Sequence, residues 1–281
     1  MTSGSPEAAP LVAGLRRLWV VTAVELRALA RRRAVVAGAV VLPPVVVWVY
    51  GVALASFPGL PGLSADPATL GRVTGALFAA AFLAGLVGLF ETVAARSGDE
   101  RAAVAGLPRS VTVVARVATV GCAAAVASIS ALATLAVGVD VAAPLVAAAV
   151  LLLAASVYGL LGVVVATLRP TELEGSLVLV FLADLDNALS SGLFPIDASL
   201  SVPWLGTVGV TDLLPLAHAN ALFTAAVLDG SLPDGHLLPA LAWPAALLPV
   251  ALVAYSRATG GLSAASHTDA AVAEIDRGWS S

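Results

Sequence analysis

Residues 95–116, ARSGDERAAVAGLPRSVTVVAR, form a charged segment inside an otherwise apolar part of the chain. On either side, residues 73–90 and 117–139 contain no Asp, Glu, Lys or Arg. A stretch of about 20 apolar residues is long enough to cross a bilayer as an α-helix. The charged segment is therefore predicted to be a loop that joins two membrane-spanning helices on one side of the membrane.

The composition of the whole chain also indicates a membrane protein. Of its 281 residues, 59% are hydrophobic and 11% are charged, whereas soluble domains have about 25% charged residues. A soluble fold of this length cannot bury so much apolar surface, so the chain is predicted to be an all-α polytopic membrane protein. The single cysteine, Cys122, lies in an apolar stretch and has no partner for an internal disulfide.

The residue types that are missing exclude several functions. The sequence contains no lysine, so all 14 basic residues are arginines. A Walker A loop needs a lysine to hold nucleotide phosphates, so this chain cannot bind ATP in that way. The motifs HExxH and G-x-S-x-G are both absent, and the three histidines are far apart in the sequence. The chain is therefore not expected to be an enzyme, and no metal site is predicted.

Six apolar segments are predicted to span the membrane within a transmembrane domain of residues 34–257. They cover residues 34–55, 73–93, 118–139, 145–168, 173–193 and 237–255. On this arrangement 13 arginines lie at the termini or in the loops 96–116 and 169–174, and only Arg72 lies on the other side. Cytoplasmic loops carry an excess of arginine and lysine, so both termini are predicted to be cytoplasmic.

The segments outside the spans have different predicted roles. Residues 1–10 are small and polar and are predicted to be disordered, and residues 258–281 are predicted to be a cytoplasmic tail. Residues 11–33 mix apolar and charged residues and are predicted to form an amphipathic helix in the membrane interface. Its candidate interfacial residues are Arg16, Arg17, Trp19, Glu25 and Arg27. Residues 208–228 are apolar but short, and are predicted to form a re-entrant or extracellular helical segment between spans five and six.

Local signals predict where helices begin and end. Ser97 and Glu100 have the spacing of a capping box, so a short helix is predicted from Gly98 to Ala105, with a stop at Gly106. Ser110 is predicted to cap the helix that follows. Asp66 before Pro67, and Thr171 three residues before Glu174, predict the starts of two further helices.

Three features resemble the permease subunits of ABC-2 type ABC transporters, which are mostly exporters. The basic segment 11–33 is similar to that family's connecting helix. Residues 99–101 (DER) and 106–110 (GLPRS) resemble its E-R-x-x-G…P-x-S/R cytoplasmic loop. Residues 191–195 (SGLFP), 203–205 (PWL) and 214–218 (LPLAH) follow the order of its re-entrant region, although Leu214 and Ala217 replace the Asn and Thr of the family's N-P-L-T stretch.

The resemblance implies a half-transporter in a bacterial or archaeal plasma membrane. A second permease chain, identical or different, and a separate ABC ATP-binding subunit would be its partners, together with membrane lipid and without nucleic acid. ATP and Mg²⁺ would bind to the ATP-binding subunit, and no cofactor to this chain. The cargo would be a small amphipathic molecule, such as a drug, an antibiotic or a lipid-like compound, that moves outward. The expected ATPase-coupling residues in the loop are Arg96, Asp99, Glu100, Arg101 and Arg109.

The polar residues of the fifth span and the segment after it leave several interpretations open. Asp184, Asp186, Asn187 and His218 are candidates for a substrate path. Buried carboxylates in a membrane are costly unless they face water or a partner, so the alternative is that the helix ends early and its carboxylates are solvated. Two other functions also remain: a secondary transporter that carries protons on Asp184 and Asp186, and a non-transporting accessory subunit.

Overall fold

The structure is a computed structural model of the chain. It describes residues 8–57, 65–168, 171–191, 198–202 and 206–278. This part of the chain is helical apart from one short hairpin. The α-helices are α1 (Ala8–Arg31), α2 (Arg33–Ala55), α3 (Pro67–Val104), α4 (Arg109–Ala136), α5 (Pro144–Thr167), α6 (Glu172–Ser190), α7 (Ala217–Leu228) and α8 (Leu237–Gly278).

Five of these helices are long and apolar enough to cross a membrane, namely α2, α3, α4, α5 and α8. The chain is therefore an α-helical protein with the features of a multi-pass membrane protein. Helix α6 has 19 residues, which correspond to a length of about 28 Å. It falls outside the five because Glu172, Glu174, Asp184 and Asp186 make it less apolar.

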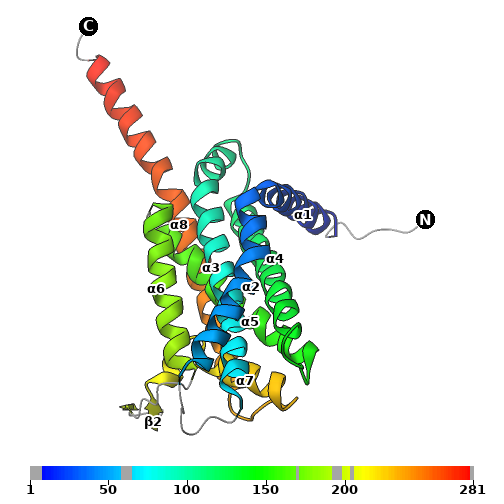
Figure 1. The fold of residues 1–281 in the computed structure, drawn as a ribbon. Coiled ribbons are helices and arrows are strands. Elements are labelled where there is room, and N and C mark those ends of the chain that lie inside the picture. Colours follow the sequence, from blue (N-terminus) through cyan, green and yellow to red (C-terminus); the bar gives the residue numbers. More distant parts are fainter. Residues whose placement is uncertain (1–7, 58–64, 169–170, 192–197, 203–205, 279–281) are drawn as a thin grey trace.

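The helices form a bundle with α3 at its centre (Figure 1). Helix α3 packs against α2, α4, α5 and α6 and is buried along most of its apolar length. One end of the bundle carries α1 and the α3–α4 turn, and we call it the arginine-rich end. The other end carries α7 and the antiparallel hairpin of β1 (Ser199–Val202) and β2 (Gly206–Gly209), followed by the short 3-10 helix η1 (Thr211–Leu213). We call it the hairpin end.

Helix α1 lies across the arginine-rich end instead of running along the bundle (Figure 1). A single residue, Arg32, separates it from α2, and the extended backbone of Arg32 (φ −78°, ψ 99°) turns the chain into the first long helix. Trp19 on α1 is 72% exposed. The predicted helix is confirmed but starts at Ala8, so residues 8–10 are helical and not disordered; residues 1–7 lie outside the described part.

The turn between α3 and α4 differs from the prediction. Helix α3 continues without a break to Val104 with Ala105 as its C-cap, so residues 98–104 form its last two turns and not a separate helix. The predicted cap at Ser97 is wrong, because a Ser-x-x-Glu pattern begins a helix only where the preceding residues leave it, and no Gly or Pro interrupts residues 89–97. The predicted stop is confirmed. Gly106 has φ +90°, and the Leu107 amide donates to the Ala102 carbonyl at 2.9 Å, as in a Schellman motif.

The other helix boundaries agree with the prediction at two helix starts and differ from it at two further positions. The Asp66 side chain accepts a hydrogen bond from the Thr69 amide at 3.0 Å, and Thr171 with Glu174 forms a complete capping box, so both predicted starts are confirmed. Helix α4 begins at Arg109 after Pro108, so the predicted Ser110 cap is wrong. Helix α8 runs on to Gly278, through most of the predicted tail.

Two pairs of glycines allow α3 and α5 to approach each other closely. A side chain added at Gly88 would meet the carbonyl oxygen of Gly159, and one added at Gly162 would meet that of Gly85 and the Leu89 amide nitrogen at 2.9 Å. Small residues at a contact between membrane helices permit this kind of backbone packing. The four glycines therefore set the distance between the two central helices.

Replacing Gly162 with valine is expected to destabilise the bundle by about 1–3 kcal/mol or more, because the new side chain meets backbone that cannot move aside. The thermal unfolding midpoint of the detergent-solubilised chain should fall. Gly121→Val on α4 is the matched control, since nothing lies within 4 Å of an added side chain there. Equal midpoints for the two variants would contradict close α3–α5 packing.

Candidate functional site

A buried group of charged side chains lies at the arginine-rich end of the bundle. Its members come from α1, α3, α4 and α8 and from the residue that joins α1 to α2, and we call it the charge cluster. It consists of Glu25, Arg32, Glu91, Asp99, Arg116, Thr119 and Tyr255. Burying a charge costs free energy unless it is paired, so each charged member of this cluster needs a partner in the right place.

Arg116 on α4 is the centre of the charge cluster and is only 2% exposed. Its guanidinium nitrogen Nη2 lies 3.1 Å from Glu25 Oε1 and 3.2 Å from Asp99 Oδ2. Its other terminal nitrogen, Nη1, lies 3.9 Å from Glu91 Oε2. One cation therefore joins α4 to α1 and to two positions of α3.

Further contacts extend the charge cluster to the neighbouring segments. Arg32 pairs with the second oxygen of Glu91 at 2.9 Å. The Thr119 hydroxyl donates a hydrogen bond to Glu25 Oε2 at 2.8 Å, and the Tyr255 hydroxyl of α8 donates one to Asp99. As a result, the α1–α2 junction and α8 are tied to the same group of side chains.

The charge cluster contains one more carboxylate than guanidinium groups. Burial raises the pKa of the Glu25 carboxyl, while the Arg116 cation and the Thr119 hydroxyl oppose that rise. The carboxyl therefore binds a proton more readily in the folded chain than it would in water. Arg116 and Arg32 are the only cations that compensate the three acids within the described part of the chain.

The predicted coupling residues occupy different positions. Asp99 faces into the charge cluster, and Arg96 donates a hydrogen bond to the Ala166 carbonyl of α5 at 2.5 Å. Glu100 is partly buried, whereas Arg101 is exposed on the last turn of α3 and has no ion pair with any described residue. Arg109 is the first residue of α4, and its side chain lies outside the described part.

The predicted interfacial residues of α1 also lie in different surroundings. Glu25 belongs to the charge cluster, whereas Arg27 is exposed. Arg16 and Arg17 line an open groove of about 520 Å³ together with Val20, Val21 and Leu107. This groove lies between α1 and the α3–α4 turn, so it places two arginines beside the tip of the loop.

The predicted path residues lie toward the hairpin end. Helix α6 continues past Asp184 to Ser190, so the alternative in which it ends early is wrong. Asp184 is exposed and accepts a hydrogen bond from the Tyr50 hydroxyl at 2.9 Å, whereas Asn187 is buried. The position of Asp184 on the bundle surface does not test whether it faces a transport path, and this stays a prediction.

Asp186 is a buried carboxylate that is held by hydrogen bonds from neighbouring segments. It is 2% exposed and accepts hydrogen bonds from the Tyr158 hydroxyl at 2.6 Å, the Ser190 hydroxyl at 2.8 Å and the Leu216 amide at 3.2 Å. A carboxylate with several donors is well stabilised. Asp186 therefore anchors the segment before α7 to α5 and α6.

His218 contacts a second histidine instead of a carboxylate. Its Nδ1 lies 3.1 Å from Nδ1 of His236, and its Nε2 lies 3.1 Å from the Asp212 carbonyl oxygen. These contacts join α7 to the loop before α8. Among the described residues, no group of three or more His, Cys, Asp or Glu side chains is arranged to hold a metal ion.

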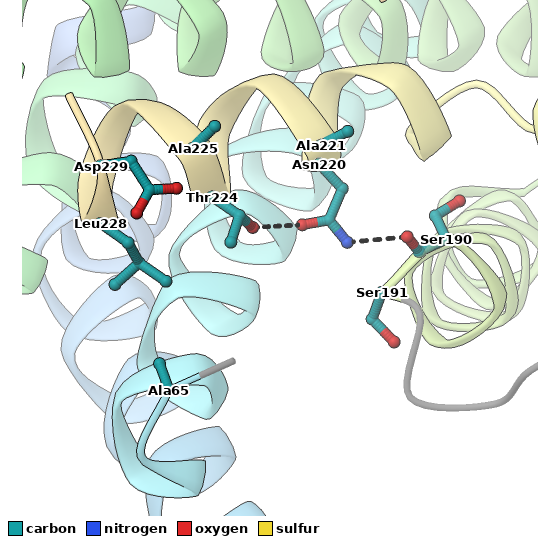
Figure 2. Close-up of a pocket in the computed structure, with 9 residues that line it drawn as sticks. All are labelled: Ala65, Ser190, Ser191, Asn220, Ala221, Thr224, Ala225, Leu228 and Asp229. Atoms are coloured by element: carbon teal, nitrogen blue, oxygen red, sulfur yellow. Dashed lines mark hydrogen bonds between the residues drawn. The ribbon is translucent and has the colours of Figure 1, made fainter. Parts of the chain in front are cut away.

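A polar pocket of about 610 Å³ opens at the hairpin end (Figure 2). Asn220 of α7 donates a hydrogen bond to the Ser190 carbonyl at 3.0 Å and accepts one from the Thr224 hydroxyl at 3.3 Å. Asp229 also lines the pocket and is its only charged residue among those described. Sequence reasoning missed this pocket, although Asn220 and Thr224 are four residues apart on an apolar helix and thus share a face.

Several members of the charge cluster were also missed. Arg116 has no predicted role beyond its place in the predicted loop 96–116, and Glu91, Thr119 and Tyr255 have no predicted role at all. A usable signal was present, because an acidic residue at the end of one predicted span and an arginine at the start of the next must lie at a similar depth. The sequence does not show that Glu25 would join them, since that depends on where α1 folds back.

Comparisons with protein-family models and with curated proteins find no match to this chain. Its function must therefore be inferred from its own residues and fold.

Proposed function

We propose that this chain is the membrane-spanning permease subunit of an ATP-driven exporter of the ABC-2 type. The observation that carries the proposal is the charge cluster, which links the tip of the α3–α4 segment to α1, α4 and α8 through Arg116. A protein that pushed on this end would act on four helices together. Such an arrangement suits a membrane domain that is driven by a separate energy-supplying subunit.

The form of α3 supports this role. It runs unbroken from the hairpin end of the bundle to the exposed turn at Gly106, so a displacement of its tip is transmitted along a rigid helix. The Schellman motif fixes the end of the helix, and Arg101 and the Arg16–Arg17 groove offer positive charge beside it. We assign these residues to the contact with the ATP-binding subunit, where ATP and Mg²⁺ would be held.

In this proposal six helices cross the membrane, α6 being the sixth, and both termini are cytoplasmic. The length of α6 is sufficient for a span, and its four carboxylates lie near its two ends or beside Tyr50 and Tyr158. The arginine distribution supports the orientation, since Arg72 alone falls on the opposite side. The hairpin end and its polar pocket would then face outward.

The cargo in this proposal is a small amphipathic molecule that leaves through a path between this chain and a second permease chain. The exposed face of α6 supports such a pairing, because it combines large apolar side chains such as Phe181 with Asp184. An apolar face with an isolated carboxylate is suited to molecules that carry both apolar surface and a polar group.

Co-purification with an ATP-binding subunit tests the proposal. We expect a Walker-motif ATPase encoded next to this chain to co-purify with it in a stable complex, and its ATP hydrolysis to respond to the presence of the chain. An ATPase of another transporter from the same cell serves as the control. Absence of any complex, together with transport driven by a proton gradient in vesicles that contain the chain alone, would refute it.

A further inference from the structure

An apolar groove of about 320 Å³ lies on the outside of the bundle where α1 turns into α2. It is formed by α1, α2, α3 and α4, and the residues that line it in the described part are apolar apart from the thiol of Cys122. Those that matter here are Leu26, Leu29, Val36, Val40, Cys122 and Val126. Val40 is 64% exposed and Val126 is 55% exposed, so the groove is open to its surroundings.

Three exposed arginines lie in the chain close to residues that line this groove. Arg27 follows Leu26 on α1, Arg31 is the last residue of α1, and Arg33 is the first residue of α2. None of the three has an ion pair with a described residue, whereas Arg32 between them turns inward to Glu91. The segments around the α1–α2 junction therefore carry three positive charges that no described residue neutralises.

The groove extends along the first turns of α2, which begins at Arg33. Val40 lies seven positions after Arg33, which is about 10 Å along a helix. These turns belong to a helix that is long and apolar enough to span a membrane, so the groove opens to hydrocarbon while the arginines lie near the interface. A ligand that fits both parts needs an acyl chain and an anionic group next to it.

We propose that this groove is a binding site for an anionic phospholipid. One acyl chain lies between α1, α2 and α4, and the headgroup phosphate is held by Arg27, Arg31 and Arg33. The placement in the cytoplasmic leaflet rests on the proposed orientation, but the site itself does not depend on transport. Because α1 forms one wall of the groove and also supplies Glu25 to the charge cluster, the bound lipid would help to keep α1 against α4.

Cys122 provides the test, since it is the only cysteine of the chain and lines the groove. The purified chain in neutral detergent is treated with N-ethylmaleimide at increasing amounts of phosphatidylglycerol or phosphatidylcholine. We expect phosphatidylglycerol to slow the modification of Cys122 at about a tenfold lower concentration than phosphatidylcholine, because each arginine near the headgroup adds to the attraction. Native mass spectrometry should show one retained phosphatidylglycerol per chain.

A matched pair of variants makes the test specific. The triple variant R27Q/R31Q/R33Q should lose the preference for phosphatidylglycerol, while R16Q/R17Q/R257Q, with the same change in charge at other exposed arginines, should keep it. Equal protection by both lipids, or none, would overturn the proposal. Protection that rises with protein concentration in the absence of lipid would also overturn it, because the groove would then be covered by a second copy of the chain. None of these readouts needs the ATP-binding subunit, so this proposal can fail independently of the proposed function.

Discussion

Replacing Arg116 with leucine is expected to destabilise the folded chain by about 3–5 kcal/mol, which is the typical result of breaking a buried ion pair by removing one partner. The substitution leaves Glu25 and Asp99 buried without the cation that joins them, and Glu91 with Arg32 alone. We expect a large fall in the thermal unfolding midpoint in detergent and in the amount of chain recovered from the membrane fraction.

Two further variants serve as controls for the loss of stability expected of Arg116→Leu. Arg257→Leu removes an exposed arginine without an ion pair in the described part and should leave the midpoint nearly unchanged. Arg116→Lys keeps the charge but cannot reach several carboxylates at once. Its unfolding midpoint should therefore lie between those of Arg116→Leu and Arg257→Leu. If Arg116→Leu were as stable as Arg257→Leu, the charge cluster could not be what holds α1, α3 and α4 together at this end.

Reversing the charge of Arg101 and Arg109 is expected to uncouple transport from ATP hydrolysis while the membrane fold is retained. Arg101 is exposed at the end of α3 and makes no ion pair with described residues, so Arg101→Glu leaves the charge cluster intact. A like charge placed against a partner surface costs several kcal/mol, which corresponds to a loss of affinity of about 100-fold or more. The affinity for the ATP-binding subunit is measured directly, and transport is measured in reconstituted vesicles.

The thermal unfolding midpoint separates this effect from a folding defect. R101E/R109E should unfold near the temperature of the unsubstituted chain, in contrast to Arg116→Leu. Arg257→Glu, which reverses an exposed charge on α8, is the control for net charge and should bind the ATP-binding subunit normally. Normal transport by R101E/R109E would mean that the ATP-binding subunit does not act on the tip of α3.

The parts of the fold that were predicted correctly depend on local chemistry. Asp66 and Thr171 start helices through bonds to amides three residues away, and Gly106 ends one because its backbone has positive φ. Each of these signals is contained in a few neighbouring residues. The apolar helices α2 and α5 agree with the predicted spans for the same reason, since length and composition decide them.

The candidate site could not be predicted in the same way, because it depends on which helices become neighbours. Glu25 is predicted to lie at the membrane interface and Asp99 to contact another protein, but both lie within reach of Arg116, in segments far apart in the sequence. Tyr255 comes from α8, more than 150 residues after Asp99. No periodic pattern in the sequence shows that these distant residues come into contact. The segment 97–105 shows a smaller failure of the same kind, because a capping pattern has no effect inside a helix that continues.

The unequal numbers of acids and bases in the charge cluster have a consequence for how the sequence can evolve. Glu25 or Asp99 can be exchanged for a neutral residue and still leave each guanidinium with a carboxylate, whereas the loss of Arg116 leaves acids on two helices without a counter-ion. Substitutions at Glu25 or Asp99 should therefore be accepted one at a time among descendants of this chain, whereas Glu91 must stay because it is the carboxylate paired with Arg32. A change at Arg116 should survive only where a carboxylate has already been lost, so the order of mutations is constrained at this position.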